Sequence, residues 1–335
     1  MKQKTTNGVA VIGYGGMGHY HCNGIRAADG LKLAGICDLS PECRQKAAEK
    51  YGVRTWSSIE ECLAADEVDV VILVLPNDLH LPIGVKALRA GKHVVVEKPM
   101  ALTFAECREL IDAAKANNRL LTVHQNRRWD NDFLAIKQAI SQGRAGKVME
   151  IEASLEGYFL PGGWRSERAK GGGILYDWGA HKIDQMLGML PGAAPVQVFG
   201  EIHYDDSRGV NIALAGMVYT RMSDGSHISY RFSHVAHHSP RPLWYVSGSD
   251  GAMVMNNLKE PVTLYKHVAK GMETTTFPGQ VIEPEPENWF RFYFNLSAAL
   301  QGKEELAVKP EESALVVRII ESAIISAREK KLVDL

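Results

Sequence analysis

The stretch VAVIGYGGMG, residues 9–18, decides how this chain folds. Residues 9–12 are an apolar run that is typical of a buried strand, and Gly13, Gly15 and Gly18 then fit the glycine pattern of a tight turn from a strand into a helix. In a βαβ unit, such a turn places the pyrophosphate of a dinucleotide at the N-terminus of the helix. We therefore expect the whole turn to contact this cofactor, through Gly13, Tyr14, Gly15, Gly16, Met17 and Gly18.

An acidic residue follows this turn at the distance in sequence that is typical of a dinucleotide-binding βαβ unit. A second apolar run, residues 31–37, ends at Asp38, which follows Gly18 by 20 positions. A carboxylate there can bind the ribose hydroxyls of the adenosine half, and it would repel the 2′-phosphate of NADP. The sequence therefore predicts NAD, with NADP as the alternative because Arg44, close to Ser40, could accept a phosphate. The competing interpretation is a glycine-rich turn in an unrelated α/β domain.

The first 125 residues alternate between strand-like and helix-like segments. The expected strands are 9–12, 31–37, 68–75, 93–96 and 120–123, and the expected helices are 16–28, 41–51, 81–90 and 104–117. Such alternation predicts a parallel sheet covered by helices on both faces. Ser40, Pro41 and Glu42 supply a cap, a proline at the first helical position and an acid in the first turn.

The pattern changes after residue 125. The expected strands become longer and alternate more, at 148–157, 196–204, 212–221, 227–232, 243–248 and 262–265, with helices at 132–140, 172–190, 288–301 and 310–330. This predicts a large open sheet that is mainly antiparallel. The expected fold class is therefore α/β: an N-terminal Rossmann dinucleotide-binding domain, 1–125, and a C-terminal α+β domain, 126–335, for substrate binding and oligomerisation. Whether the closing helices pack back on the first domain stays open.

Composition argues against several classes of partner. The chain has 335 residues with 38 basic and 39 acidic side chains, a formal net charge of −1, which gives no electrostatic footprint for nucleic acid or an anionic membrane. No apolar run approaches the roughly 20 residues of a membrane span. Residues 1–7 are polar and lack the apolar core of a signal peptide, so the expected location is the cytoplasm.

Neither the cysteines nor the clustered histidines predict a metal site. The five cysteines all lie in the first third of the chain and form no C-x-x-C pair, so we expect free, mostly buried thiols. His234, His237 and His238 lack a nearby cysteine or acid, and the last two are adjacent, so that in a strand they would face opposite ways. We interpret this segment as a loop at the edge of a substrate site.

Two segments follow expected strands at the edge where ligands bind to parallel sheets. The first is 75–80, where Asn77 could reach the nicotinamide ribose or could cap the next helix, and Leu75, Pro76 and His80 are further cofactor candidates. The second is Glu97-Lys98-Pro99, where the proline restricts the backbone of the lysine. The ammonium of Lys98 could stabilise a developing alkoxide, and Glu97 and Lys98 are also cofactor candidates. Taken alone, Lys98 would be interpreted as a solvated loop lysine.

A third candidate segment starts with three glycines at 171–173. On a helix, Asp177, His181 and Asp184 would project from one side because they are four and three residues apart. A histidine suits proton transfer from a hydroxyl near neutral pH, and the glycines permit close backbone approach to a ligand. A lone histidine on an apolar helix is more often structural, but one framed by two carboxylates favours function.

These motifs, in this order, resemble the glucose-fructose oxidoreductase/inositol dehydrogenase family, often written Gfo/Idh/MocA. The resemblance covers nearly the whole chain and implies Lys98, Asp177 and His181 as the catalytic set. It implies hydride transfer between a nicotinamide cofactor and a secondary alcohol of a sugar, a sugar derivative or a cyclitol. Segments 125–130 and 164–165 are similar to those of scyllo-inositol dehydrogenase-like members and of related sugar oxidoreductases. The resemblance also implies a homodimer or homotetramer formed through the C-terminal sheet.

The expected substrate contacts extend beyond the catalytic set. We expect the loop 158–170 to arch over the sugar, with Tyr158, Trp164 and Arg165 in contact with it, and Arg127 to bind substrate as well. The alternative for the loop is a mobile glycine-rich connection. Two other functions are compatible with the fold: an NAD-dependent glycoside hydrolase or lyase that oxidises the sugar transiently, and a cofactor-binding regulator without catalysis. A regulator would have no reason to keep Lys98 together with Asp177 and His181.

Overall fold

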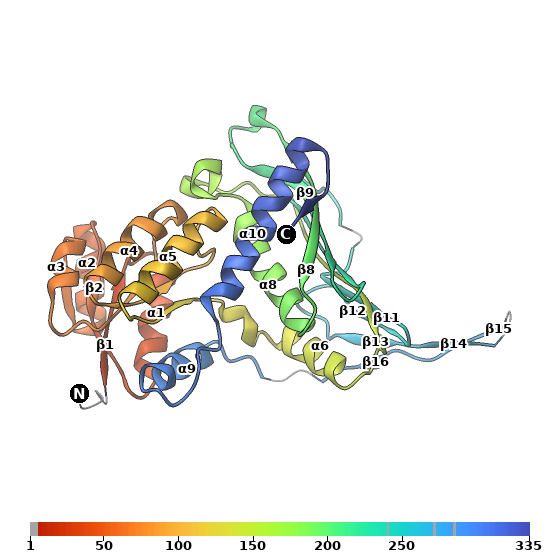
Figure 1. Cartoon of the computed structure of the whole chain (residues 1–335), viewed down its shortest axis with the longest axis horizontal. Coiled ribbons are helices and arrows are strands. Elements are labelled where there is room, and N and C mark those ends of the chain that lie inside the picture. The colour runs from red at the N-terminus through yellow and green to blue at the C-terminus, as the bar shows by residue number, and fades with distance from the viewer. Residues whose placement is uncertain (1–5, 240, 271–272, 284–285) are drawn as a thin grey trace. The chain divides into compact units, whose positions relative to one another are not determined.

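The computed structural model describes residues 6–239, 241–270, 273–283 and 286–335. The chain forms two compact units (Figure 1). Unit 1 combines residues 1–126 with 289–317, and unit 2 combines residues 127–288 with 318–335.

Unit 1 contains a six-stranded sheet in the order β3-β2-β1-β4-β5-β6, with every neighbouring pair parallel. Its strands are β1 (Asn7–Ile12), β2 (Leu31–Cys37), β3 (Arg54–Trp56), β4 (Val70–Leu73), β5 (His93–Val96) and β6 (Leu121–Val123). This is the strand order of a dinucleotide-binding sheet. The order in which successive strands are added reverses between β1 and β4, while all strands stay parallel. The prediction of a parallel, doubly wound N-terminal sheet is confirmed.

Helices accompany this sheet. They are α1 (Gly16–Ala27), α2 (Pro41–Tyr51), α3 (Ile59–Ala64), α4 (His80–Arg89), α5 (Phe104–Ala116), α9 (Arg291–Leu300) and the first part of α10 (Pro310–Glu329). The predicted start of α2 is confirmed, because the Ser40 hydroxyl accepts a hydrogen bond from the Cys43 N–H at 3.3 Å. The short elements β3 and α3 were not predicted.

Unit 2 contains a nine-stranded sheet in the order β16-β13-β12-β11-β7-β10-β9-β8-β17. Its strands are β7 (Val148–Glu156), β8 (Pro195–Tyr204), β9 (Ala213–Met222), β10 (His227–Ser233), β11 (Trp244–Gly248), β12 (Ala252–Met255), β13 (Thr263–Tyr265), β16 (Gln280–Val281) and β17 (Val333–Asp334). The pair β7–β10 is parallel and the other neighbours are antiparallel, so the sheet is mixed. A separate ribbon, β14 (His267–Lys270) with β15 (Glu273–Thr276), extends from it (Figure 1).

Three helices and the end of α10 accompany the sheet of unit 2. They are α6 (Asn131–Ser141), α7 (Ile174–Asp177) and α8 (Gly179–Met189). The prediction of one helix over 172–190 is wrong in detail, because α7 begins only after Gly173, whose φ is +87°, and a break at Trp178 separates α7 from α8. The hydroxyl of Tyr230 on β10 donates to the carbonyl of Ile174 at 3.2 Å, which holds α7 on the sheet.

The five cysteines are free, and four of them are buried, as predicted. Among the described residues, no helix is both long enough and apolar enough to cross a membrane.

Candidate active site

The three glycines of the turn between β1 and α1 have different physical reasons to be there. A Cβ on Gly13, whose φ is +97°, would lie 2.2 Å from the carbonyl oxygen of Val74, and one on Gly18 would lie 2.6 Å from that of Gly13. Those two positions need glycine for the turn and for helix–strand packing. A Cβ on Gly15 would meet no described atom within 4 Å. Open space at this position, before the N-terminus of α1, fits a pyrophosphate group.

The carboxylate of Asp38 closes the other side of this turn. Its Oδ2 accepts a hydrogen bond from the backbone N–H of Tyr14 at 2.7 Å, and its Oδ1 accepts one from the N–H of Ser40 at 2.8 Å. A guanidinium nitrogen of Arg44 donates to the carbonyls of Asp38 and Leu39. The acid is therefore fixed beside the glycine turn, with carboxylate lone pairs left for ribose hydroxyls.

The segment after β4 contains a buried histidine and a buried asparagine. His80 is fully buried, and its ring nitrogens lie 3.0 Å from the carbonyl oxygen of Pro99 and 3.1 Å from that of Leu75. The ring thus ties the end of β4 to the turn after β5, and its predicted contact with a cofactor stays a prediction. Asn77 is buried at the start of a 3₁₀ turn, 77–79, and the residues at the N-caps of this turn and of α4, Pro76 and Leu79, form no side-chain capping bond. Both alternatives for Asn77, the ribose contact and the helix cap, stay predictions.

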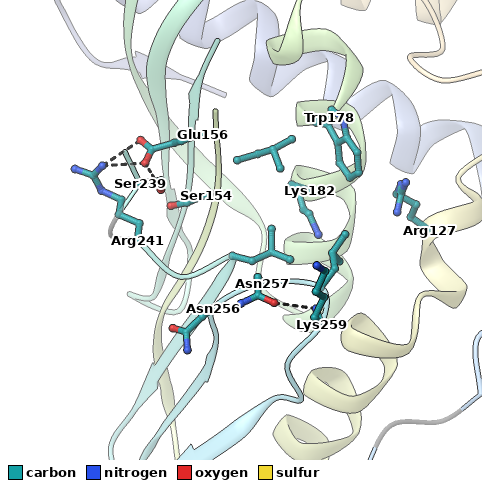
Figure 2. A pocket seen from close by; sticks show the side chains of 13 residues that line it. Arg127, Ser154, Glu156, Trp178, Lys182, Ser239, Arg241, Asn256, Asn257 and Lys259 are labelled. Carbon is teal, nitrogen blue, oxygen red and sulfur yellow. Dashed lines mark hydrogen bonds and ion pairs between the residues drawn. The ribbon is translucent and has the colours of Figure 1, made fainter. Parts of the chain in front are cut away.

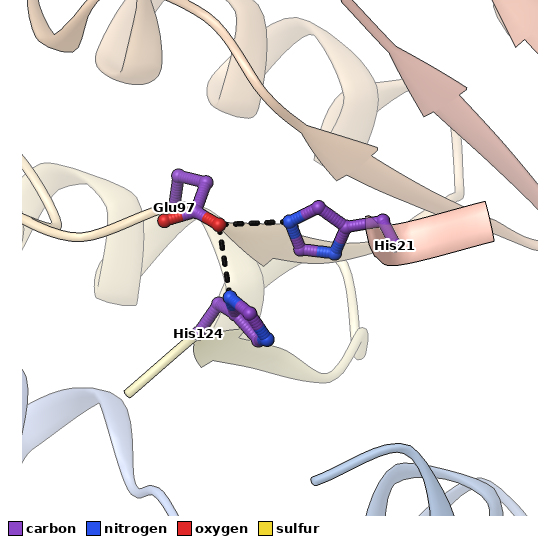
Figure 3. A group of neighbouring side chains, drawn as sticks. All are labelled: His21, Glu97 and His124. Atoms are coloured by element: carbon purple, nitrogen blue, oxygen red, sulfur yellow. Dashed lines mark hydrogen bonds and ion pairs between the residues drawn. The ribbon is translucent and has the colours of Figure 1, made fainter. Parts of the chain in front are cut away.

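Glu97 is the centre of a buried network in unit 1 that the sequence analysis missed (Figure 3). Its Oε1 lies 2.8 Å from Nε2 of His21 and 2.9 Å from Nδ1 of His124. The Tyr293 hydroxyl lies 3.0 Å from the other ring nitrogen of His21, to which it can donate. Glu97 Oε2 accepts from the backbone N–H of Lys98 at 3.1 Å. The carboxylate of Glu97 is thus engaged with protein groups, and the predicted contact of this residue with the cofactor stays a prediction.

The same network explains the charge state of the acid. Burial alone would raise the pKa of Glu97, but the charges of His124 and His21 and the hydrogen bonds from them hold it well below its usual range. Burial lowers the pKa of His21 to about 4, with a further contribution from His124. A carboxylate with two N–H donors is therefore stable here without solvent.

His21, Glu97 and His124 are also the one group of possible metal ligands found among the described residues. Donors bound to a tetrahedral zinc at 2.0–2.1 Å lie about 3.3 Å from one another. The contacts of Glu97 with the two rings, 2.8 and 2.9 Å, are shorter and are those of hydrogen bonds. The geometry therefore supports a hydrogen-bonded network of Glu97 with His21 and His124 at this position.

Lys98 is the second residue after β5, at the carboxyl end of the parallel sheet, and is partly exposed. β5 neighbours β4, which neighbours β1, so Lys98 and the glycine turn leave the sheet at the same edge. The structure of unit 1 therefore places the predicted lysine on the cofactor-binding edge.

In unit 2, Asp177 ends α7 and His181 lies in the first turn of α8. Asp177 is partly exposed and His181 is 6% exposed. Trp178 connects them with helical backbone angles, and its ring centroid lies 6.3 Å from that of His181. The two predicted catalytic side chains thus flank one aromatic residue at a helix junction.

Asp184 has a different partner from the one that the sequence suggested. It is buried, and its two carboxylate oxygens accept from Nε of Arg128 at 2.7 Å and from Nη2 at 2.5 Å. This paired, bidentate contact fastens the segment before α6 to α8. Its geometry indicates a structural residue rather than a second acid beside His181.

The loop 158–170 is fastened at both ends. His234 lies with Nδ1 2.9 Å from the carbonyl oxygen of Phe159, while its Nε2 accepts from the N–H of Ile174 at 3.0 Å. At the other end, the backbone N–H of Arg168 donates to the carbonyl of Asn211 at 2.7 Å. The loop is therefore held at both ends, and His234 anchors its start. The predicted place of the segment 234–238 at the edge of a substrate site stays a prediction.

The triple glycine serves this anchoring. A Cβ on Gly172 would lie 2.4 Å from the carbonyl oxygen of Arg165, so the close backbone approach expected here is made by the chain itself. Near the middle of the loop, the guanidinium of Arg165 lies 4.5 Å from the ring centroid of Trp164. Tyr158 is 58% exposed, and its ring centroid lies 4.8 Å from that of His237, with the two rings tilted by 32°. The predicted substrate contacts of this loop thus have side chains that reach solvent.

A cavity of about 550 Å³ lies in unit 2 beside the helix junction (Figure 2). Trp178 and Lys182 line it on one side, and Arg127 also lines it, with its guanidinium 4.3 Å from the Trp178 ring centroid. Lys182 is 2% exposed, and burial lowers its pKa to about 8. Of the predicted substrate residues, Arg127 is the one that lines this cavity.

Two family models match the chain. The model described as "Oxidoreductase family, NAD-binding Rossmann fold" matches residues 7–125, and the "GFO/IDH/MocA C-terminal domain" matches residues 133–254. The chain belongs to the GFO/IDH/MocA oxidoreductase family. The GFO/IDH/MocA assignment also identifies the N-terminal domain as an NAD-binding Rossmann domain, as the sequence predicted.

Known proteins agree with this assignment over different lengths. An uncharacterised oxidoreductase of Schizosaccharomyces pombe is 40% identical over 150 residues, 44% of this chain and 40% of that protein, so this match spans about two fifths of the relative. The scyllo-inositol 2-dehydrogenase (NADP(+)) IolW of Bacillus subtilis is 27% identical over 98% of this chain and 95% of its own length. The crystal structure of an NAD-binding protein from Listeria innocua has a TM-score of 0.89 and 30% identity, covering 99% of this chain and 100% of that one.

Proposed function

We propose that this GFO/IDH/MocA protein is an NAD(P)-dependent dehydrogenase that acts reversibly on a secondary alcohol of a sugar, a sugar derivative or a cyclitol. One observation carries the proposal: the glycine turn with Asp38 and the ammonium-bearing Lys98 leave the same edge of the parallel sheet in unit 1. Hydride transfer from an alcohol requires a binding site for the cofactor and a cation near the substrate oxygen, here at one edge of the sheet.

Each catalytic residue has a distinct role in this proposal. When bound, NAD⁺ accepts the hydride from the carbinol carbon. His181 takes the hydroxyl proton, and Lys98 donates a hydrogen bond to the same oxygen as it gains alkoxide character. Asp177 orients the site through a neighbouring hydroxyl of the substrate or through the lysine. The partly exposed Tyr158, Trp164 and Arg165 contact the sugar from the loop.

The relative IolW supports the choice of substrate class. It is named as a scyllo-inositol 2-dehydrogenase, and its similarity extends over nearly the full length of this chain. It also keeps NADP open as a second cofactor, since that relative is named for NADP⁺. Asp38, fixed by the N–H groups of Tyr14 and Ser40, supports NAD as the preferred one.

A screen of the purified protein tests the proposal. Inositols, aldoses, ketoses and simple glycosides are offered with NAD⁺ and, separately, with NADP⁺, and the formation of reduced cofactor is followed at 340 nm. Oxidation of at least one polyol or sugar is the expected result. Release of free sugar from a glycoside without net reduction of cofactor would instead assign a glycosidase with transient oxidation. Binding of cofactor with no reaction across the screen would assign a regulator.

We also propose a homodimer or homotetramer through the sheet of unit 2, in the cytoplasm. Large apolar side chains are exposed on or beside this sheet, among them Met149, Tyr204 and Val281. Five free cysteines suit a reducing compartment. Light scattering on the purified chain tests the assembly, and a monomer at micromolar concentration would contradict it.

A further inference from the structure

We infer that the cavity beside α8 binds an anionic group, so that the substrate is an acidic sugar or cyclitol carrying a carboxylate or phosphate. This rests on the proposed function, whose substrate class it narrows. The cavity, about 550 Å³, has the size of a small-molecule site. Arg127, Lys182, Arg241 and Lys259 line it, and Glu156 is the one acidic side chain among its lining residues (Figure 2).

Lys182 is the deepest of these cations. Its Nζ lies 4.1 Å from the ring centroid of Trp244 and 3.8 Å from Oδ2 of Asp132, a distance beyond that of a hydrogen bond. That same oxygen accepts a hydrogen bond from Nε1 of Trp244 at 2.7 Å, and the other oxygen of Asp132 accepts from the Phe133 N–H at 2.8 Å. The charge of Asp130 also acts on Lys182. Because an ammonium has three donors and its distance to Asp132 is beyond that of a hydrogen bond, Lys182 has donor capacity for a ligand.

Glu156 does not cancel this positive charge. Its carboxylate is paired with Arg241 at 3.0 and 3.2 Å, and it also accepts a hydrogen bond from the Ser239 hydroxyl at 2.8 Å. Arg127 is bonded to Asp130 at 3.1 Å, but Asp130 does not line the cavity. The wall therefore presents more positive than negative charge to a ligand, and the acids that balance it lie mostly behind the wall.

The position of the cavity connects it to the proposed chemistry. Trp178 and Lys182 line the cavity, and each directly follows a proposed catalytic residue, Asp177 or His181. Neither Asp177 nor His181 lines the cavity, because consecutive side chains on a helix point in different directions. The inference therefore requires a substrate that extends along the helix junction, with its alcohol at His181 and its acidic group at the cationic wall. Arginine and lysine bind carboxylate and phosphate by charge-assisted hydrogen bonds, whereas a neutral polyol needs no such set of cations.

Binding measurements on the NAD-loaded protein test the inference without requiring turnover. Calorimetric titrations compare D-glucuronate and D-glucose 6-phosphate with D-glucose, and myo-inositol 1-phosphate with myo-inositol. We expect at least one acid to bind at least about tenfold more tightly than its neutral parent, and more weakly at high salt. Preference for the carboxylate or for the phosphates distinguishes the two sources of charge.

Two substitutions and a matched control complete the test. Lys182→Met and Arg241→Gln should each weaken binding of the acid about tenfold or more, with little effect on the neutral parent. Arg241 is 43% exposed in its side chain, so its replacement is compatible with folding even if Lys182→Met is not. Arg208→Gln is the control, because Arg208 is 40% exposed, is paired with Asp205 and lies outside the cavity lining.

The outcomes separate this inference from the proposed function. Acids that bind no more tightly than their neutral parents, or acid binding that is unchanged in Arg241→Gln, would overturn the anionic-group site. Tight, variant-sensitive binding of an acid that is never oxidised with either cofactor would leave the site standing and overturn the dehydrogenase.

Discussion

The backbone N–H of Lys98 donates a hydrogen bond to the side chain of Glu97, the residue that precedes it, over 3.1 Å. The second oxygen of the same carboxylate is held by His21 and His124. The main chain at the proposed catalytic lysine is therefore fixed to a buried network and not only to its strand. In this motif the acid acts on the position of its neighbour, and the lysine remains available for chemistry.

Acid should destabilise unit 1 through His21. Burial lowers the pKa of His21 from 6.5 to about 4, so between these values the unfolded chain binds a proton that the folded chain does not. The free energy of unfolding should therefore fall with falling pH, by about 1.4 kcal/mol per pH unit from this group. Glu97, whose pKa is held well below 4.5, should lower the free energy of unfolding further in more acidic solution.

Urea unfolding at pH 7, 6 and 5 measures this dependence. His21→Gln should reduce the slope over this range, whatever its effect on absolute stability. His203→Gln is the control, because His203 is 65% exposed in its side chain, and it should keep the slope of the native chain. Equal slopes for His21→Gln and the native chain would show that His21 is not the group responsible.

The glycine turn predicts opposite effects for two neighbouring positions. Gly15→Val should leave the melting temperature nearly unchanged, because φ at Gly15 is −81° and its Cβ would meet no described atom, but should weaken NAD binding about tenfold or more. Gly13→Ala should destabilise the fold by roughly 1–3 kcal/mol or more, because its φ is +97° and its Cβ would overlap the Val74 carbonyl. Thermal unfolding and cofactor titration of both variants check this, and unaltered NAD affinity in Gly15→Val would contradict it.

Asp38 should set the choice between the two nicotinamide cofactors. The native chain should bind NAD more tightly than NADP, because the 2′-phosphate would face this carboxylate. Asp38→Asn keeps two side-chain polar atoms but removes the charge, so it should reduce the ratio of the two dissociation constants. Titration of each cofactor against the native chain and the variant gives this ratio. A ratio that does not change would assign the discrimination to another group.

His181→Ala and Lys98→Met should each reduce turnover roughly 10²–10⁴-fold, because they remove the proposed proton acceptor and alkoxide donor. NAD affinity should stay within a few-fold of the native value, since neither residue belongs to the glycine turn. Steady-state kinetics on a substrate from the screen, with parallel cofactor titration, measures both quantities. Native turnover in either variant would remove that residue from the catalytic set.

Asp184→Asn should act on stability. The substitution breaks a buried, bidentate pair with Arg128, and losing one partner of such a pair costs about 3–5 kcal/mol. Arg128→Gln should cause a comparable loss because it breaks the same contact. Denaturant unfolding gives both values, and turnover is compared at a temperature at which the variants are folded. Full stability with strongly reduced turnover would instead place Asp184 in the reaction.

The N-terminal sheet could be predicted closely because its strands are local apolar runs between glycine and proline signals. The bounds of β2, β5 and α2 agree with the prediction residue for residue. In contrast, β12, the edge strands β16 and β17, and the ribbon β14–β15 are short, and their pairing depends on neighbours distant in sequence. Local patterns carry little information about such pairings.

The candidate site was only partly predictable for a similar reason. His124 follows β6 directly, so its place beside Glu97, which follows β5, could have been inferred from two adjacent parallel strands. The roles of His80 and His234 could not, because each ring binds carbonyl or N–H groups of segments brought together by the fold. The same holds for Lys182, whose acid partner Asp132 lies 50 positions earlier in the chain.

The loop 158–170 is anchored through its backbone while several of its side chains are exposed. His234 contacts the carbonyl of Phe159 and Gly172 allows the backbone of Arg165 to lie against the glycine segment, whereas the side chains of Tyr158, Phe159 and Leu160 are exposed to solvent. The backbone of this short segment thus contributes to stability, and its side chains remain available for recognition. Substitutions at the exposed positions can change which substrates are accepted while the anchors keep the fold, so substrate range can evolve here independently of the cofactor domain.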